Sequence, residues 1–391
     1  MSTPRKDPFI HLPVVMIFTR EGLSLLNAAK NPNVKKVAGR EGVAREGLDS
    51  KSYNAPTVQK FIMNSFLEEI YVCLPDLLRK RHEIISTNNM VLYSILYKKL
   101  TPALAQMLFE SPVVADFNRK NPKHSMVDLK HINKQNADKL VTGKAELFQK
   151  IRDEIHEAVL ALNWNSESLS PEEKEVRIRS LPKFINWIDN RIWYLYYIIY
   201  QTPLKEEIKK SFAKMVSRYL DHTRLATHMS NLLMEFIQNA EKASFERIIV
   251  NNNMAPRAEI DRFIRDRSNR EFVIQEAEKV GQMLQLSWNM NSERSSAGRQ
   301  YRVLTTISNY GLIDEKVRRD LATKMKTDTE GINLASFYQD TGDAEKLGAG
   351  LGLLYNSYLE DLCKKEGLFY RCNIYPEPRL EKTTVQIELA L

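Results

Sequence analysis

Residues 347–367 read LGAGLGLLYNSYLEDLCKKEG, and this stretch decides how the second half of the chain is interpreted. Gly348, Gly350 and Gly352 alternate with other residues directly before a segment of helical periodicity. Glycines at this spacing allow backbone N–H groups to approach an anion at the positive end of the following helix. The chain has only 14 glycines, and this arrangement costs conformational entropy, which indicates a geometric need. We therefore expect an anion-binding loop followed by a helix from about 350 to 365.

The second segment with functional side chains is MEFIQNAEKA, residues 234–243 of a long predicted helix. Glu235 and Asn239 are four residues apart and Lys242 follows three residues later, so the three side chains leave one helix face. An amide oxygen is a hard ligand for Mg²⁺, an ammonium group attracts phosphate, and a carboxylate activates water. The pattern indicates a face for a hydrated Mg²⁺ and its phosphates, or else a polar face that meets only solvent.

The third segment, VLTTISNYGLIDEKVRRDL at 303–321, reads as a strand, a turn and an amphipathic helix from about 314 to 325. Asn309 and Gly311 stand at the end of the strand, where a polar side chain either contacts a ligand or forms an ordinary turn. Further strands are expected in QLSWNMNSERSSAGRQYRVLTTIS (285–308), FERIIVNNN (245–253), LFYRCNIYP (368–376) and TTVQIELAL (383–391). Helices and strands without regular βαβ order predict an α+β sandwich with a mixed sheet covered by helices.

The first half of the chain has a different pattern. Residues 1–55 are irregular, and residues 56–205 show apolar residues at three- and four-residue steps. The stretch PTVQKFIMNSFLEEIYVCLPDLLRKRHEII, for example, predicts a helix that Pro75 kinks or splits. We expect an all-helical bundle over 56–205, acting as a sensor, dimerisation or docking domain, followed by an α+β domain over 206–391.

The order and spacing of the three segments, with the closing strand, resemble the ATP-binding domain of the GHKL superfamily. This superfamily includes gyrase, heat-shock chaperone, histidine kinase and mismatch-repair ATPases, and the resemblance covers about residues 210–391. GAGLGL at 348–353 matches the lid motif of the family, and EFIQNAEKA matches its Asn-bearing helix. The family motif Asp-x-Gly-x-Gly is replaced by Asn309-Tyr310-Gly311-Leu312-Ile313, so an amide stands where the family has a carboxylate.

The resemblance implies ATP and Mg²⁺ as cofactors and assigns a role to each matching residue. Asn239 would coordinate Mg²⁺, Lys242 would contact phosphate, and Glu235 would activate water. Asn309, beside Gly311, and Thr384 would face adenine. The remaining matching residues form the loop that would close over the phosphates: Gly348, Gly350, Leu351 and Gly352.

Three functions follow as hypotheses. The first is a cytoplasmic regulatory protein that binds ATP and Mg²⁺, hydrolyses it if active, and is coupled to a helical interaction domain. The second is a catalytically inactive GHKL-fold scaffold that acts by protein contact, which Asn309 and Ile313 favour. The third is a divergent histidine kinase that uses His156 in DEIHEAVLAL as phosphoacceptor, although such a histidine is more commonly structural.

Composition limits the remaining classes of function. Lys and Arg number 57 and Asp and Glu number 49, so the formal net charge is +8 on a chain of 391 residues. The basic clusters contain acidic residues and no nucleic-acid motif, so a protein partner or a homodimer is expected rather than nucleic acid. The three cysteines are too few for a disulfide framework, which fits a cytoplasmic location. The apolar run IWYLYYIIY at 192–200 is too short to span a membrane and is expected in the core.

Overall fold

The computed structural model describes residues 8–29, 33–38, 43–164, 169, 171–295, 298–313, 315, 318, 319 and 351–391. The chain divides into two compact units, which we call unit 1 (Met1–Ile95 with Thr227–Leu391) and unit 2 (Leu96–Ala226). The boundary between them falls within two long helices, α3 (Arg81–Phe109) and α10 (Thr223–Asn251). These bounds differ from the predicted divisions after residues 55 and 205.

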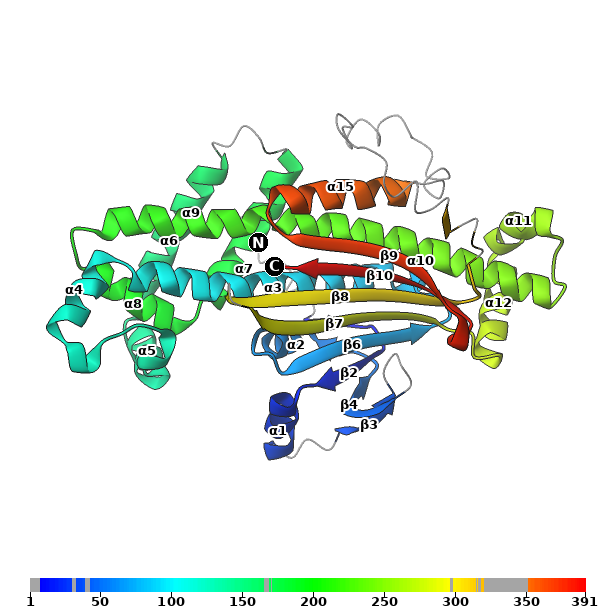
Figure 1. The fold of residues 1–391 in the computed structure, drawn as a ribbon, viewed down its shortest axis with the longest axis horizontal. Coiled ribbons are helices and arrows are strands. Elements are labelled where there is room, and N and C mark those ends of the chain that lie inside the picture. Colours follow the sequence, from blue (N-terminus) through cyan, green and yellow to red (C-terminus); the bar gives the residue numbers. More distant parts are fainter. Residues whose placement is uncertain are drawn as a thin grey trace, which may run out of the picture. The chain divides into compact units, whose positions relative to one another are not determined.

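Unit 1 is built on an eight-stranded sheet in which every pair of neighbouring strands is antiparallel (Figure 1). The strand order is β3-β4-β2-β6-β7-β8-β10-β9. The strands are β2 (Val14–Phe18), β3 (Lys35–Ala38), β4 (Ala44–Ser50), β6 (Leu67–Leu74), β7 (Leu284–Ser295), β8 (Gly298–Tyr310), β9 (Phe369–Glu377) and β10 (Lys382–Ala390). A separate two-stranded sheet pairs β1 (Phe9–Ile10) with β5 (Tyr53–Asn54).

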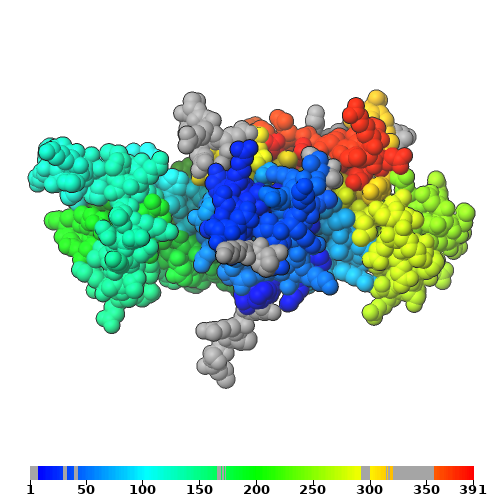
Figure 2. Space-filling view, turned by 90° about the horizontal axis from the view of Figure 1, so that it is seen from below, coloured from blue at the N-terminus to red at the C-terminus, as the bar shows by residue number. Residues whose placement is uncertain are grey.

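The predicted α+β class is confirmed. The predicted mixed sheet is wrong, because all described strand pairs are antiparallel, and the predicted order of a helical half followed by a sheet-containing half is wrong too. The N-terminal residues contribute β2, β3, β4 and β6 to the same sheet that β7–β10 complete. They also form two short helices, α1 (Arg20–Ala28) and α2 (Ala55–Met63). Figure 2 shows these N-terminal residues, in blue, as one continuous patch of the surface seen from below. Residues 1–55 are therefore not irregular where they are described.

The strand β6 is the clearest departure from the expected helix over residues 56–85. Helix α2 ends at Met63, and Ser65 then adopts a left-handed φ of 59°, which turns the chain out of the helix. The residues that follow, LEEIYVCL, are rich in side chains that favour strands. Their isoleucine and valine are fully buried, because β6 lies between β2 and β7 in the middle of the sheet. Apolar residues suited to a helix face thus belong to a central strand.

Helices α3 and α10 pack against one face of the sheet. Trp288 of β7 is fully buried, and its indole N–H donates to Oδ1 of Asn88 on α3 at 3.0 Å. Asn88 in turn donates to the hydroxyl of Ser230 on α10 at 2.9 Å. A buried polar chain of this kind fixes the position of both helices on the sheet, because each group would lose a hydrogen bond if one helix moved. We call this the helix-covered face.

Helix α10 continues through FERIIVN and ends at Asn251, so the expected strand there is wrong. Phe245, Ile248 and Ile249 lie at three- and four-residue steps and pack against two further helices, α11 (Ile260–Arg265) and α12 (Arg267–Lys279). The same β-branched residues that favour a strand locally are therefore held in a helix by tertiary burial. Residues 260–279 form two helices rather than one, because the backbone is extended at Asp266 between α11 and α12.

The expected helix before the last strands is confirmed as α15 (Leu351–Lys365). Its Asn356 accepts a hydrogen bond from the hydroxyl of Tyr370 on β9 at 2.8 Å. Its Tyr358 ring lies 4.9 Å from the ring of His228 on α10. In Figure 1, α15 runs back along α10 in the opposite direction before the chain enters β9. The predicted strands over 285–308, 368–376 and 383–391 are confirmed as β7 to β10, while most of the helix predicted over 314–325 lies outside the described residues.

Unit 2 is helical throughout its described residues, and its aromatic side chains form a core. Trp193 of α8 stacks on Phe212 of α9 at 5.6 Å between ring centroids, and both rings are fully buried. The apolar run at 192–200 is α8, whose buried face belongs to this core. Besides parts of α3 and α10, the described α-helices of unit 2 are α4 (Pro112–Lys120), α5 (Lys134–Gly143), α6 (Ala145–Trp164), α7 (Pro171–Trp187), α8 (Asn190–Tyr200) and α9 (Lys205–Asp221). Among the described helices, none is both long enough and apolar enough to cross a membrane.

Candidate functional site

The three residues predicted on one helix face lie on α10 as expected from their spacing. Glu235 is half-buried, whereas Asn239 and Lys242 are exposed. The residues on the other side of the helix, among them Ile237 and Ala240, are buried. We call the surface that carries Glu235, Asn239 and Lys242 the α10 ligand face.

Lys242 is engaged at the end of this face. Its Nζ lies 3.0 Å from Oδ1 of Asp261 on α11 and 3.8 Å from Oε1 of Glu246, one turn further along α10. The Lys242 and Asp261 side chains are 53% and 68% exposed, so the pair contributes little to stability. A ligand phosphate could replace Asp261 as the partner of Lys242 at small energetic cost.

A cavity of about 680 Å³ continues the α10 ligand face beyond Lys242. Its walls are the next two turns of α10, the start of α11 with the residues before it, and Leu312 after β8. Two arginines, Arg247 and Arg257, and two carboxylates, Glu246 and Asp261, line it together with apolar side chains. The full lining is Ala243, Glu246, Arg247, Val250, Asn251, Arg257, Ala258, Ile260, Asp261 and Leu312. A cavity of this size and mixed lining suits a ligand of nucleotide size.

The predicted turn at Gly311 lies beside this cavity, because the next residue, Leu312, and the neighbouring Arg247 both line it. Gly311 has φ of +107°, a conformation that favours glycine. Its N–H donates to the carbonyl of Glu381 at 2.8 Å, and its own carbonyl accepts from the hydroxyl of Thr383 at 2.6 Å. A Cβ at Gly311 would lie 3.0 Å from Nη1 of Arg247 on α10. The end of β8, the start of β10 and α10 therefore meet at this glycine, which we call the Gly311 corner.

Asn309 and Thr384 do not share a face of the sheet, although both were predicted to contact adenine. Asn309 pairs with Thr383 in the β8–β10 register, and Thr384 pairs with Ser308. Side chains of paired residues lie on the same face, and successive side chains alternate. Asn309 and Thr305 are four residues apart on β8, so their side chains point to the same face of the sheet. Thr305 pairs with Trp288, whose side chain contacts α3, so Asn309 and Thr383 lie on the helix-covered face. Thr384 points to the other face and is buried.

The hydrogen bonds of these residues agree with that division. The Asn309 amide donates to the carbonyl of Tyr310 at 3.2 Å. The Thr384 hydroxyl lies 2.9 Å from the hydroxyl of Ser308 and donates to Oε1 of Glu377 at 2.5 Å. Thr383, which the sequence pattern did not distinguish from its neighbour, is therefore the threonine on the side of Asn309.

The glycine-rich motif is described only in part. Gly348 and Gly350 lie outside the described residues, while Leu351 and Gly352 open α15. Leu351 precedes Tyr358 by about 10 Å of helix, and Glu235 follows His228 by the same length. Figure 1 shows that α15 and α10 run antiparallel. Because Tyr358 and His228 are in contact, the equal spacing places the first turn of α15 near the level of Glu235. The positive end of α15 therefore lies near the level of Glu235 along α10.

Burial changes the acid–base chemistry of Glu235. The partial burial of its carboxyl raises its pKa above the ordinary value, and the positive charge of Arg81 opposes that shift. A carboxylate with a raised pKa is a stronger base for a water molecule, so this group fits the predicted role.

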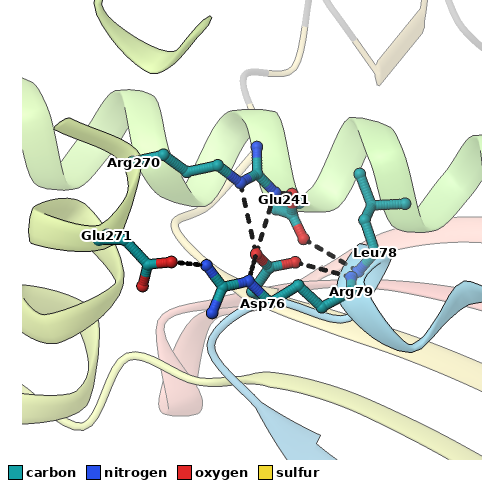
Figure 3. A network of polar contacts seen from close by, with 6 residues as sticks. All are labelled: Asp76, Leu78, Arg79, Glu241, Arg270 and Glu271. Carbon is teal, nitrogen blue, oxygen red and sulfur yellow. Dashed lines mark hydrogen bonds and ion pairs between the residues drawn. The ribbon is translucent and has the colours of Figure 1, made fainter. Parts of the chain in front are cut away.

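A buried cluster of charged groups in unit 1 was not predicted. Asp76, which follows β6, and Glu241, on the buried side of α10, are both 3% exposed at their side chains. Arg270 of α12 bonds both: it contacts Glu241, and its Nη2 lies 3.2 Å from Oδ2 of Asp76 (Figure 3). Arg79 also contacts Asp76, with Nε at 3.3 Å from Oδ2, and pairs with Glu271 of α12. We call these five residues the Arg270 network.

Backbone groups complete the Arg270 network. The N–H of Leu78 donates to Glu241 at 3.3 Å, and the N–H of Arg79 donates to Asp76 at 3.0 Å. Burial and the nearby charge of Asp76 raise the pKa of Glu241 to about 7, against the opposing charge of Arg270. The sequence signal that was missed is a glutamate on the apolar side of an amphipathic helix. Glu241 lies on that side together with Ile237, Ala240 and Ser244. A carboxylate buried there needs a cation or hydrogen-bond donors as partners.

The side chains of the site fit a Mg²⁺ ion that takes most of its ligands from phosphates and waters. Among the residues that the structure describes, no three His, Cys, Asp or Glu side chains lie close enough to hold a metal ion. Mg²⁺ keeps several waters and commonly takes few protein ligands when phosphates supply the others. The exposed amide oxygen of Asn239 fits that role, whereas an all-protein metal centre has no support in the described residues.

The remaining candidate from the sequence is His156. It lies half-buried on α6 of unit 2. The three cysteines, Cys73, Cys363 and Cys372, are free, in agreement with the expectation of no disulfide framework.

The fold and the site define an α+β protein in which helices cover one face of an antiparallel sheet and a cavity lies beside the longest helix of unit 1. The chain belongs to the family described as "Family of unknown function (DUF8084)", whose model matches residues 5–391. A protein of Treponema pallidum (strain Nichols) described as "Uncharacterized protein" is similar to this chain. It is 24% identical over 393 residues, which cover 99% of each chain. No solved structure matches this chain.

Proposed function

We propose that unit 1 binds ATP together with Mg²⁺, in the manner that the resemblance to GHKL ATPases implies. The observation that supports this most is the convergence of segments far apart in the sequence. The α10 ligand face, the Gly311 corner and the start of α15 border one end of the sheet, beside a cavity of about 680 Å³.

In this proposal the phosphates lie on the α10 ligand face and the base lies toward the Gly311 corner. Asn239 would supply one ligand to Mg²⁺, and the cation would neutralise phosphate charge. Lys242 would exchange Asp261 for a phosphate oxygen. At the corner, Asn309 and Thr383 would meet the base, with Thr383 in the place first assigned to Thr384, because only Thr383 shares the face of Asn309.

Hydrolysis is the second part of the proposal and requires a base. Glu235 lies one helical turn before Asn239, and its raised pKa favours proton abstraction from water. Unit 2, which is helical and has its own aromatic core, would then be the interaction domain that couples nucleotide binding to a protein partner or a second copy.

Calorimetric titration with ATP and Mg²⁺ tests the binding proposal. Asn239→Ala is compared with Gln238→Ala, because both side chains are exposed on α10 and only Asn239 belongs to the ligand face. We expect binding by the wild type and by Gln238→Ala, and at least tenfold weaker binding by Asn239→Ala. The absence of heat with the wild type at millimolar ATP contradicts the proposal. If binding is found, Glu235→Gln should bind ATP but lose turnover.

The scaffold that acts by protein contact alone is the second candidate, and two contacts favour it. Lys242 is already paired with Asp261, and the amide of Asn309 is bonded to the chain's own carbonyl. This candidate predicts a normal fold and a protein partner without ATP binding.

A histidine kinase is the third hypothesis. It would carry an acid-labile phosphate on His156, and His156→Gln would remove that label. The absence of label on the wild type rejects this hypothesis.

A further inference from the structure

Strand β9 is the last strand at one edge of the eight-stranded sheet, and among the described strands it pairs with β10 alone. In an antiparallel edge strand, alternate residues direct their N–H and C=O groups away from the sheet. Within the described part of the chain, the backbone of residues 369–375 makes no hydrogen bond other than those to β10. The outer edge of β9 therefore offers a row of backbone donors and acceptors to a further strand.

A groove of about 530 Å³ follows this edge, and we call it the β9 groove. Its lining is Arg318, Arg319, Asn356, Glu360 and residues 369–374. Successive side chains of a strand point to opposite faces of the sheet, so consecutive residues line one groove where that groove runs along the backbone edge. The hydroxyl of Tyr370 donates to Asn356 at 2.8 Å and holds α15 beside the strand as one wall (Figure 1). The β9 groove thus has the place and the direction of an added strand.

The charged side chains along the β9 groove are mainly arginines. Arg318 and Arg319 share one carboxylate, Glu315, at 2.8 and 3.2 Å. Arg371 is exposed, and no carboxylate of the described residues is bonded to it. Glu360 is the carboxylate that lines the groove itself. Three guanidinium groups beside one lining carboxylate favour an occupant with acidic side chains.

A second copy of β9 fits the groove less well than an acidic segment does. Two copies that pair over residues 369–374 run antiparallel about a two-fold axis. This arrangement places Arg371 opposite or next to the same arginine of the other copy, and like charges at such positions destabilise strand pairing. The charge of the groove thus favours a different chain as the occupant.

We propose that the β9 groove binds an extended acidic segment of a partner protein, which adds to the sheet as a further strand. Backbone hydrogen bonds to β9 supply the affinity, and acidic side chains beside Arg371, Arg318 and Arg319 supply the selectivity. Because side chains alternate along a strand, the segment carries acidic residues at every second position. This inference does not depend on the nucleotide site, since the β9 groove shares no residue with the α10 ligand face or its cavity.

Fluorescence anisotropy with two short labelled peptides tests the proposal on the full chain. One peptide alternates glutamate with valine and the other alternates lysine with valine, so both favour an extended backbone and differ in charge. We expect the glutamate peptide to bind roughly tenfold more tightly than the lysine peptide. Methylation of the backbone nitrogens at every second residue should abolish binding for one of the two possible sets, because only one set faces β9.

Substitutions on the two edge strands separate the β9 groove from general attraction between charges. Arg371→Glu should weaken binding of the glutamate peptide by roughly tenfold, and Arg371→Ala, which adds no negative charge, by a smaller factor. Lys36→Glu changes an exposed cation on β3, the strand at the other edge of the sheet, and should bind as the wild type does.

Hydrogen exchange locates the bound peptide. Binding of the glutamate peptide should slow exchange of the outward amides within residues 369–375 and leave residues 35–38 of β3 unchanged. The absence of binding at millimolar glutamate peptide overturns the proposal. Equal binding of the two peptides, an affinity unchanged in Arg371→Glu, or protection that excludes residues 369–375 also overturns it.

Discussion

Replacing Arg270 by alanine should destabilise unit 1 by an amount that depends on pH. The substitution leaves Asp76 and Glu241 without the cation that contacts both, and each side chain is only 3% exposed. Removing one partner of a buried ionic group costs about 3–5 kcal/mol. The Arg270 side chain is itself 27% exposed, so water can replace part of its interaction. We therefore expect a loss near the lower limit, about 3 kcal/mol, at pH 8.

The loss should be smaller at pH 5.5. A carboxyl whose pKa is raised on folding contributes stability below its unfolded pKa, and this contribution is lost as pH rises through the folded value. For Glu241 that interval runs from 4.5 to about 7. At pH 5.5 Glu241 carries its proton in the folded wild type and in the variant, so Arg270 is needed only for Asp76, which Arg79 also contacts. A loss of about 1.5 kcal/mol is then expected, as for one hydrogen bond to a charged group.

Urea denaturation monitored by ¹⁹F NMR of 5-fluorotryptophan measures this loss in unit 1 alone. Trp288 is the tryptophan of unit 1, and the other three lie in unit 2. Lys35→Ala is the matched control, because the Lys35–Asp49 pair also lies in unit 1 but both side chains are more than half exposed. It should change stability by less than about 0.5 kcal/mol. A loss below about 1 kcal/mol in Arg270→Ala, or one equal at both pH values, would refute the reasoning.

Further substitutions test the packing of unit 1, at Trp288 and Gly22, and of unit 2, at Trp164 and Gly143. Trp288→Phe removes the buried N–H that donates to Asn88 and should lower the free energy of unfolding by about 1–3 kcal/mol, as measured by urea denaturation. Trp164→Phe, at a position 70% exposed, should have almost no effect. Gly22→Ala should prevent normal packing of α1, because its Cβ would lie 2.1 Å from a backbone carbonyl oxygen. Gly143→Ala, where no atom lies within 4 Å of the added carbon, should be neutral or stabilising by up to about 1 kcal/mol in the same assay.

Local patterns predicted the strands near the C-terminus correctly because those patterns report their own environment. The β7–β8 hairpin and β10 alternate apolar and polar side chains, as strands with one covered face do. Helix α15 follows a regular three- and four-residue spacing after its glycines. In such segments the local preference and the tertiary structure agree, so sequence alone is sufficient.

The segments that were wrongly predicted are those in which tertiary packing overrides local preference. LEEIYVCL continues the helical spacing of α2, yet it is a central strand, because it pairs with β2 on one side and with β7 on the other. FERIIVNNN favours a strand, yet Phe245, Ile248 and Ile249 complete a helical face against α11 and α12. Neither partner surface is visible in the local sequence.

The candidate site, like the fold, was predicted only in part. Helical spacing was sufficient to place Glu235, Asn239 and Lys242 on one face. Strand register, which the sequence does not contain, was needed to separate Thr383 from Thr384. The Arg270 network could not be predicted, because its members come from three distant segments and only the fold brings them together.

Photolabelling with 8-azido-ATP and Mg²⁺, followed by peptide mapping, tests the proposed nucleotide site most directly. The account predicts label on peptides that contain residues 243–251 or 309–313, the two segments that meet at Arg247 and Gly311. Excess unmodified ATP should suppress this label, and Asn239→Ala should reduce it. Label that ATP does not suppress, or that maps to unit 2 or to β2, β3 and β4 at the far edge of the sheet, would contradict a nucleotide site at this corner.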